Sequence, residues 1–271
     1  ENSDTLMGKY GEEGDRLIFK ILNRGDKLKK ALNNVSNEEN PSQGKIEHTL
    51  CAEALRYDLT VPFARYVVQH RNDITFPFKR YQMQPVWRAD RPQKGRYQEF
   101  YQCDADIIGT DSLIAEYELI KMLDEVFEAL DLNVLIKLNN RKILSGISLQ
   151  YGLEDKFSEF TVLLDKLEKA GKDSILEQMH EGGFPDDMEQ LLTGMESVGS
   201  MSGNQEQLSA IEKYCGDQKI GLQGVQEMKE ILTYVHQTGL KKARIQLDPT
   251  LARGLNYYTG TIVEVIASDA R

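Results

Sequence analysis

The chain has 271 residues, of which 40% are hydrophobic and 28% charged, enough apolar material for one large domain or two small ones. Its formal charge of -10, from 33 basic and 43 acidic residues, argues against a surface coated in positive charge for nucleic acid, but does not exclude a local basic patch. Three scattered cysteines exclude a disulfide framework or a CxxC metal site, so we expect reduced thiols and a cytoplasmic protein.

The sequence shows no targeting or membrane signal. No apolar run reaches about 18 residues, so neither a membrane span nor a membrane partner is expected. The first residues do not have the character of a signal or transit peptide. Because the chain lacks an initiator Met and stops just after a strand-like run, we expect a fragment of a longer protein.

The first predicted elements follow from local patterns. Residues 17–22 are expected to form a short strand, and the polar residues 33–44 a loop. Pro62 is expected to open a helix that runs to about His70, because proline is tolerated only in the first helical turn.

A long antiparallel hairpin comes next. Residues 78–88 and 97–108 are rich in Tyr, Phe, Val, Trp and Ile, as strands are, and the polar residues 89–96 join them. After the hairpin, Asp111 is expected to cap a helix whose apolar residues recur with helical period as far as Leu130.

The composition changes in the second half of the chain. A strand at 134–138 and a helix at 141–151 precede a series of short amphipathic helices at 153–240, and strands resume at 243–247 and 261–266. The pattern predicts an α+β fold in which an antiparallel sheet flanked by helices is interrupted by an all-helical insertion. The predicted divisions are a first part of the core at 1–149, the insertion at 150–240 and a second part of the core at 241–271.

Charge is distributed unevenly along the chain. The helical insertion holds seven basic and 17 acidic residues, so the entire formal charge of -10 lies there. The region from Arg71 to Gln102 instead holds seven basic and three acidic residues. Because guanidinium groups suit phosphate and carboxylate oxygens, the hairpin is a candidate for anion binding. A solvated tip with a charged rim is the alternative.

The second hairpin strand has one polar face. Period-2 alternation places Phe100, Gln102, Asp104 and Asp106 on the same side. An amide and two carboxylates do not pack a hydrophobic core, so this face is expected to line a polar cleft.

Two further segments stand out. Residues 58–60 (Asp-Leu-Thr) lie just before the expected Pro62 helix. Residues 251–260 contain Arg253 between small residues and the adjacent Tyr257 and Tyr258. A purely structural alternative places Tyr257 in the core and Tyr258 at its rim.

These segments resemble the histidyl-tRNA synthetases, a family of class II aminoacyl-tRNA synthetases. Residues 55–65 (LRYDLTVPFAR) are similar to the amino-acid-binding segment, residues 86–104 (VWRADRPQKGRYQEFYQCD) to class II motif 2, and residues 253–260 (RGLNYYTG) to the histidine-specific peptide. The order and spacing of all three fit, and the resemblance spans nearly the whole chain. It implies the antiparallel sheet, the flanking helices and the helical insertion expected above.

The resemblance also implies a reaction. Histidine and ATP form histidyl-adenylate and pyrophosphate, and the histidyl group then passes to the terminal ribose of the histidine tRNA. By the resemblance, the catalytic residues are Arg88, which contacts the histidine carboxylate and the α-phosphate, and Arg253, which approaches that phosphate from the opposite side. Mg²⁺ is expected to arrive with the ATP phosphates, with no metal site in the protein.

The remaining site residues are likewise implied by the resemblance. Asp58, Thr60 and Gln102 would hold the α-ammonium group of histidine, and Leu59 would be a further residue of the histidine-binding segment. The imidazole would be read by Asp106 and Tyr258, with Tyr257 beside them. The ATP side would comprise Asp90, Arg96, Tyr97 and Phe100, with Phe100 stacked on adenine.

The chain departs from the family pattern in several places. Asp90 stands where many class II enzymes have Glu, Asn256 where Asp is common, and Asp106 is shorter than the Glu of some relatives; these changes are conservative. Motif 1, motif 3 and the anticodon-binding domain are not found in this chain, and a homodimer is expected for the longer protein. The fragment alone is expected to bind histidine weakly and to be inactive in aminoacylation.

The main alternative is a binding module, a synthetase-like regulatory subunit of histidine biosynthesis. Such relatives tend to lose the motif 2 arginine and the pocket groups, which are present here. The four histidines show no metal-ligand spacing. Lys27, Lys29 and Lys30 are expected in a solvated turn, with contact to acceptor-stem RNA as an alternative.

Overall fold

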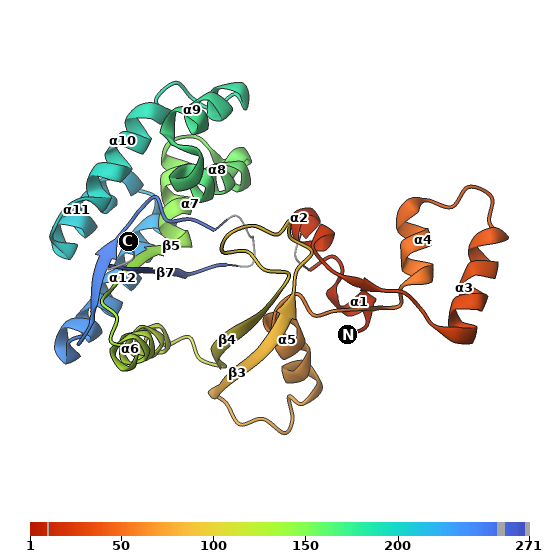
Figure 1. Ribbon diagram of the computed structural model, residues 1–271. Coiled ribbons are helices and arrows are strands. Elements are labelled where there is room, and N and C mark those ends of the chain that lie inside the picture. The colour runs from red at the N-terminus through yellow and green to blue at the C-terminus, as the bar shows by residue number, and fades with distance from the viewer. Residues whose placement is uncertain (10, 254–257, 269–271) are drawn as a thin grey trace. The chain divides into compact units, whose positions relative to one another are not determined.

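The computed structural model describes residues 1–9, 11–253 and 258–268, the side chains of 11–13 excepted. The chain divides into two compact units, Glu1–Thr110 and Asp111–Arg271. Figure 1 shows their elements. None of the helices in the described residues is long and apolar enough to cross a membrane.

The first unit combines five helices with two small antiparallel sheets among its described residues. The helices are α1 (Ser3–Leu6), α2 (Gly11–Arg16), α3 (Gly25–Ser36), α4 (Gln43–Leu50) and α5 (Thr60–Gln69). The strands are β1 (Lys20–Ile21), β2 (Glu53–Ala54), β3 (Phe78–Trp87) and β4 (Glu99–Ile108). Strand β1 pairs with β2, and β3 with β4.

Two predictions for the N-terminal region need correction. The strand expected at 17–22 is reduced to Lys20–Ile21. The loop expected at 33–44 is shortened to 37–42, because α3 extends to Ser36 and α4 begins at Gln43. Helix α3 forms because its apolar residues repeat at helical spacing, and its neighbour α4 lies alongside it within the unit (Figure 1).

The central hairpin is confirmed as a long antiparallel pair. Its register runs from Phe78 opposite Ile108 to Trp87 opposite Glu99. Helix α5 precedes it, beginning at Thr60 with Pro62 in its first turn, as expected. The polar tip of the hairpin therefore spans residues 88–98.

The second unit is a three-stranded sheet packed with helices. Its helices are α6 (Ile114–Ala129), α7 (Arg141–Gln150), α8 (Phe157–Ala170), α9 (Lys172–Glu181), α10 (Met188–Gly199), α11 (Asn204–Cys215) and α12 (Lys219–Thr238), with a 3₁₀ turn, η1 (Glu154–Lys156). Its strands are β5 (Val134–Asn140), β6 (Ala243–Leu247) and β7 (Thr261–Ala267), in the order β6-β5-β7.

The α+β fold is confirmed, with two differences in the second unit. Strand β5 is antiparallel to β7 but parallel to β6, because the chain between β5 and β6 crosses over through helices. The expected capping of α6 by Asp111 is wrong: the helix begins at Ile114, whose N–H donates to Ser112 Oγ at 3.4 Å.

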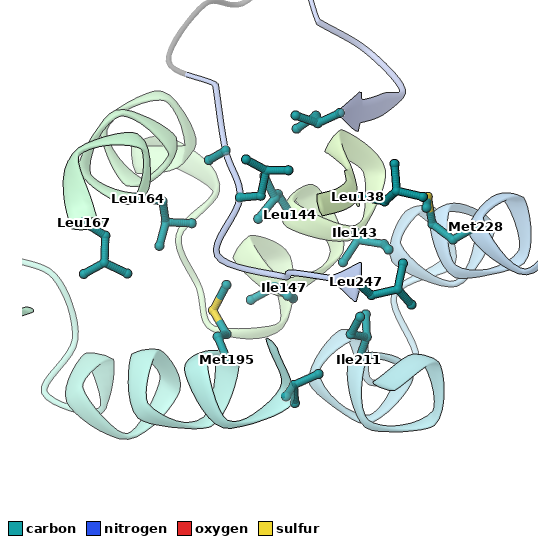
Figure 2. Packing of buried hydrophobic residues seen from close by; sticks show 14 of the residues in the cluster. Leu138, Ile143, Leu144, Ile147, Leu164, Leu167, Met195, Ile211, Met228 and Leu247 are labelled. Atoms are coloured by element: carbon teal, nitrogen blue, oxygen red, sulfur yellow. The ribbon is translucent and has the colours of Figure 1, made fainter. Parts of the chain in front are cut away.

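One continuous hydrophobic cluster joins the sheet to the helices. Figure 2 shows Leu138 of β5 and Ile143 of α7 among side chains from α8, α10, α11 and α12. Helices α7 and α12 approach so closely that a Cβ added to Gly146 would lie 2.4 Å from the Cα of Gly221. The 150–240 insertion thus packs directly on β5, α7 and β6, and its boundaries stay a prediction.

Candidate functional site

The polar face of β4 has the exposure that its alternation predicted. Gln102, Asp104 and Asp106 are half-buried, whereas Tyr101 and Cys103 on the opposite face are exposed. Gln102 Oε1 is buried and accepts no hydrogen bond from the described residues. A buried carbonyl oxygen of this kind is ready to accept a hydrogen bond from a ligand.

Carboxylates gather on this face. Burial raises the pKa of Asp104, and the negative charges of Asp106 and Asp58 raise it further, while Arg80 and Arg88 oppose the shift. The pKa of Asp106 is also raised by burial, against the effect of Arg80. Three carboxylates within electrostatic reach of one another make the site favourable for an added cation such as an ammonium group.

Arg80 partly compensates this negative charge. Its Nε lies 2.8 Å from Asp106 Oδ2, in an ion pair that is not an aligned hydrogen bond. Its Nη1 donates to Gln82 Oε1 at 2.8 Å and its guanidinium lies 3.9 Å from the ring centre of Phe63. A cavity of about 400 Å³ between α5 and β3 is lined by Arg80, Gln82 and Phe63, among others.

Arg88 is held at the end of β3 between two aromatic rings. Its guanidinium carbon lies 4.4 Å from the ring centre of Tyr57 and 5.1 Å from that of Phe100. Its Nε donates to the Tyr57 carbonyl oxygen at 3.3 Å. These contacts restrict the side chain while leaving donors of its planar fork for an anion.

The 58–60 segment links this arginine to α5. Asp58 is 6% exposed, and its Oδ1 accepts the N–H of Val61 at 3.2 Å, which orders the first turn of the helix. Leu59 is fully buried, and its carbonyl accepts Arg80 Nη2 at 3.4 Å. Thr60 begins α5 and is exposed.

The predicted ATP residues lie at the hairpin tip. Arg96 Nη1 lies 3.4 Å from Asp90 Oδ1, and the Asp90 carbonyl accepts Gln98 Nε2 at 3.1 Å. Tyr97 is 68% exposed. Arg96 and Tyr97 are exposed, whereas Asp90 is half-buried like the carboxylates of β4, and Phe100 lies half-buried on β4 itself.

The other predicted residues belong to the second unit. Arg253 is half-buried, and its carbonyl oxygen accepts Arg141 Nη1 at 2.8 Å. Tyr258 is half-buried, and Tyr257 lies outside the described residues. The structure therefore brings Asp58, Arg88 and the polar face of β4 together in the first unit, and Arg253 and Tyr258 are positioned by the second.

Sequence reasoning missed three polar residues of these sites. Arg80 faces Asp106 directly across the hairpin, and Gln82 faces Asp104, which the alternation had already placed on the polar face. The register of the two strands is the signal that would have identified Arg80 and Gln82. Arg141 contacts Arg253 from 112 positions away, and no local pattern indicates that contact. Among the described residues, no three His, Cys, Asp or Glu side chains are grouped so as to hold a metal ion.

Comparisons with known proteins agree on one family. A family model described as "Histidyl-tRNA synthetase" matches residues 48–271. A histidine--tRNA ligase of Christiangramia forsetii is 51% identical over 99% of this chain and 58% of its own length. One of Bacteroides fragilis is 52% identical over the whole of this chain and 59% of its own length. The chain thus spans somewhat more than half the length of these relatives.

Solved structures share the fold. A histidyl-tRNA synthetase from Nostoc sp. PCC 7120 matches with a TM-score of 0.73 and 28% identity, over 98% of this chain and 55% of that one. A protein from Bacillus halodurans described as an ATP phosphoribosyltransferase regulatory subunit/histidyl-tRNA synthetase matches with a TM-score of 0.70 over 94% of this chain and 58% of that one. Its identity is 18%, so this second match shows the fold alone.

Proposed function

Because the chain belongs to the histidyl-tRNA synthetase family, we propose that the whole protein ligates L-histidine to its tRNA at the expense of ATP. The observation that carries the proposal is the opposed charge on one hairpin. Arg88 offers an anion-binding fork, while Asp58, Asp104 and Gln102 Oε1 offer acceptors for a cation. An amino acid carries both charges, so this pattern is complementary to it.

The proposed first step joins histidine to AMP. A carboxylate oxygen of histidine forms a bond to the α-phosphorus of ATP, and the bond from that phosphorus to the bridging oxygen breaks, releasing pyrophosphate. Arg88 and Arg253 stabilise the negative charge that builds on the phosphoryl oxygens. Positioning and charge stabilisation suffice, with no protein nucleophile.

In the second step, a terminal ribose hydroxyl of the tRNA attacks the carbonyl carbon of the adenylate. The ester bond forms, and AMP leaves with the electrons of the carbon–oxygen bond. The hydroxyl proton passes to a phosphate oxygen of the departing AMP and from there to water. AMP is a good leaving group, so this step also depends chiefly on orientation.

Side-chain selection is assigned to Asp106 and the tyrosines. Asp106 and Tyr258 would accept and donate hydrogen bonds at the two ring nitrogens, with Tyr257 beside them, so an apolar amino acid would leave these groups unpaired. The ion pair of Asp106 with Arg80 supports this role, because it fixes the carboxylate on the polar face of β4. Leu59 and Thr60 complete the histidine segment.

ATP is proposed to lie along the hairpin tip. Phe100 would stack on adenine, and Asp90, Arg96 and Tyr97 would contact the nucleotide. Mg²⁺ would supply charge neutralisation on the phosphates when bound, and it is proposed to be carried by those phosphates. The whole protein is further proposed to be a cytoplasmic homodimer, with the core at 1–149 and 241–271 and the insertion at 150–240.

Charging of tRNA by the whole protein with each amino acid in turn tests the proposal. We expect incorporation that requires ATP, histidine and the histidine tRNA. Histidine binding without any charging or pyrophosphate exchange would instead identify a regulatory binding module and overturn the proposal.

A further inference from the structure

We infer that Arg141, the first residue of α7, is a positioning residue that fixes the backbone of Arg253 for adenylate formation. The inference rests on the proposed function, in which Arg253 stabilises the charge on the α-phosphate. Arg141 does not itself approach the substrate in this scheme. It acts through the chain segment that carries Arg253.

One residue spans both described ends of the 253–260 peptide. Arg141 Nη1 donates to the carbonyl oxygen of Arg253 at 2.8 Å. The backbone N–H of Arg141 donates to the carbonyl oxygen of Gly260, also at 2.8 Å. The start of α7 is therefore bonded to this peptide at Arg253 and again at Gly260.

The Arg141 side chain is itself held in place. It is 6% exposed, and its guanidinium carbon lies 4.7 Å from the ring centre of Phe157. Burial lowers the pKa of Arg141, which reflects the cost of keeping a charged group away from water. A buried guanidinium needs hydrogen-bond acceptors to offset this cost, and the carbonyl oxygen of Arg253 is one of them.

The chain leading to Arg253 is anchored by Asn139 of β5 and by Asp248, which follows β6. Asn139 Nδ2 donates to the carbonyl oxygens of Pro249 at 3.1 Å and Leu251 at 2.8 Å. Asp248 Oδ1 accepts the N–H of Thr250 at 3.0 Å. The bond from Arg141 extends this series of hydrogen bonds to the carbonyl oxygen of Arg253 itself.

The physical consequence concerns the reacting geometry more than the affinity. With its carbonyl fixed, the backbone of Arg253 has little rotational freedom, so its side chain leaves the Cα atom in one direction. Without the bond from Arg141, the peptide rotates more freely and the guanidinium is displaced from its productive position. A displacement of about 1 Å near the reacting atoms costs up to about 100-fold in rate.

The test uses the whole protein and single-turnover formation of histidyl-adenylate. Arg141→Met keeps the apolar stem over Phe157 but removes the donor, and Arg141→Lys retains one charged donor. Arg244→Ala removes an exposed arginine of the same unit and serves as the first control. Asp124→Asn perturbs a buried carboxylate of the same unit away from the 253–260 peptide, and controls for stability loss alone.

We expect Arg141→Met to lower the rate of adenylate formation about 10–100-fold, with KM for histidine changed less than about threefold. Arg141→Lys should recover part of the loss. The decisive measurement is the effect of Arg141→Met in an Arg253→Ala background. In that background the rate loss caused by Arg141→Met should be below about threefold, because the Arg253 guanidinium that Arg141 positions is already absent.

Two results would overturn the inference. One is a wild-type rate of adenylate formation in Arg141→Met. The other is a rate loss that is not specific to Arg253: it persists undiminished in the Arg253→Ala background, or Asp124→Asn reproduces it at equal melting temperature. If the unmodified whole protein makes no histidyl-adenylate, the proposed function fails, which is a different outcome from either of these.

Discussion

Asp124 of α6 provides a direct test of how the second unit is held together. Its side chain is fully buried, and its oxygens accept the backbone N–H groups of Lys241, Lys242 and Ala243 at 2.9–3.0 Å. Lys121 Nζ lies 3.3 Å away. One carboxylate therefore satisfies the three successive donors that lead into β6.

Asp124→Ala would leave these three donors, of which the Ala243 N–H is buried, without their acceptor. At about 1–3 kcal/mol for each unsatisfied group, the loss is at least about 3 kcal/mol. Single substitutions rarely exceed about 5 kcal/mol. We therefore expect the free energy of unfolding to fall by about 3–5 kcal/mol, and amide protons at 241–243 to exchange faster.

The effect should depend on pH. Burial acts to raise the pKa of Asp124, but the backbone hydrogen bonds from Ala243, Lys241 and Lys242 outweigh it, so the pKa is lowered. A carboxyl whose pKa is lower in the folded state stabilises above its unfolded pKa of about 3.9, and this stabilisation disappears as pH falls through the folded pKa. The difference between wild type and Asp124→Ala should therefore shrink in acid.

Urea denaturation followed by circular dichroism, with hydrogen exchange at 241–243, measures both effects. Asp131→Asn is the matched control, because Asp131 is 89% exposed, pairs with Lys242 of the same turn and has a positive φ that Asn tolerates. The control should leave the protection of 241–243 unchanged. Wild-type stability and protection in Asp124→Ala would refute the reasoning.

Two further predictions concern the polar hairpin and the helix contact. Asp104→Asn should raise the melting temperature at pH 7, because burial and Asp106 raise the pKa of Asp104 and its charged form is therefore destabilising. This gain in melting temperature should vanish below about pH 4, where the carboxyl is protonated in both the folded and the unfolded state. The same substitution should weaken histidine binding about tenfold. A stable variant with unchanged histidine affinity would contradict the second part. Gly146→Ala should lower the free energy of unfolding by about 1–3 kcal/mol in urea denaturation, since its Cβ would lie 2.4 Å from Gly221 Cα. The control Gly44→Ala, whose Cβ would have nothing within 4 Å, should raise the free energy of unfolding by about 0.5–1 kcal/mol. Equal effects of the two substitutions would contradict the close helix contact.

Local periodicity predicted the elements whose patterns are strong. The alternation of β4 identified the half-buried face with Gln102 and Asp106, and the apolar runs located β6 and the helices of the insertion. Helix α3 was missed because its polar second half, around Asn33, resembles a loop in composition although its apolar face continues to Val35. Composition was a poorer guide there than spacing.

Contacts between distant segments were beyond local reasoning. The pairing of Arg80 with Asp106 depends on the register of the hairpin, and the parallel pairing of β5 with β6 depends on the path of the intervening helices. The bond from Arg141 to Arg253 joins residues 112 positions apart. Family resemblance named Arg253, but only the folded structure shows what holds it.

Histidine-dependent exchange of pyrophosphate into ATP, measured on the whole protein, tests the central claim most directly. Arg88→Ala removes the guanidinium held between Tyr57 and Phe100, whereas Arg91→Ala removes an exposed arginine of the same hairpin tip. We predict exchange that requires histidine, a loss on the order of 100-fold or more in Arg88→Ala, and near-wild-type exchange in Arg91→Ala. Exchange that proceeds at the same rate without histidine, or a near-wild-type exchange rate in Arg88→Ala, would contradict the account.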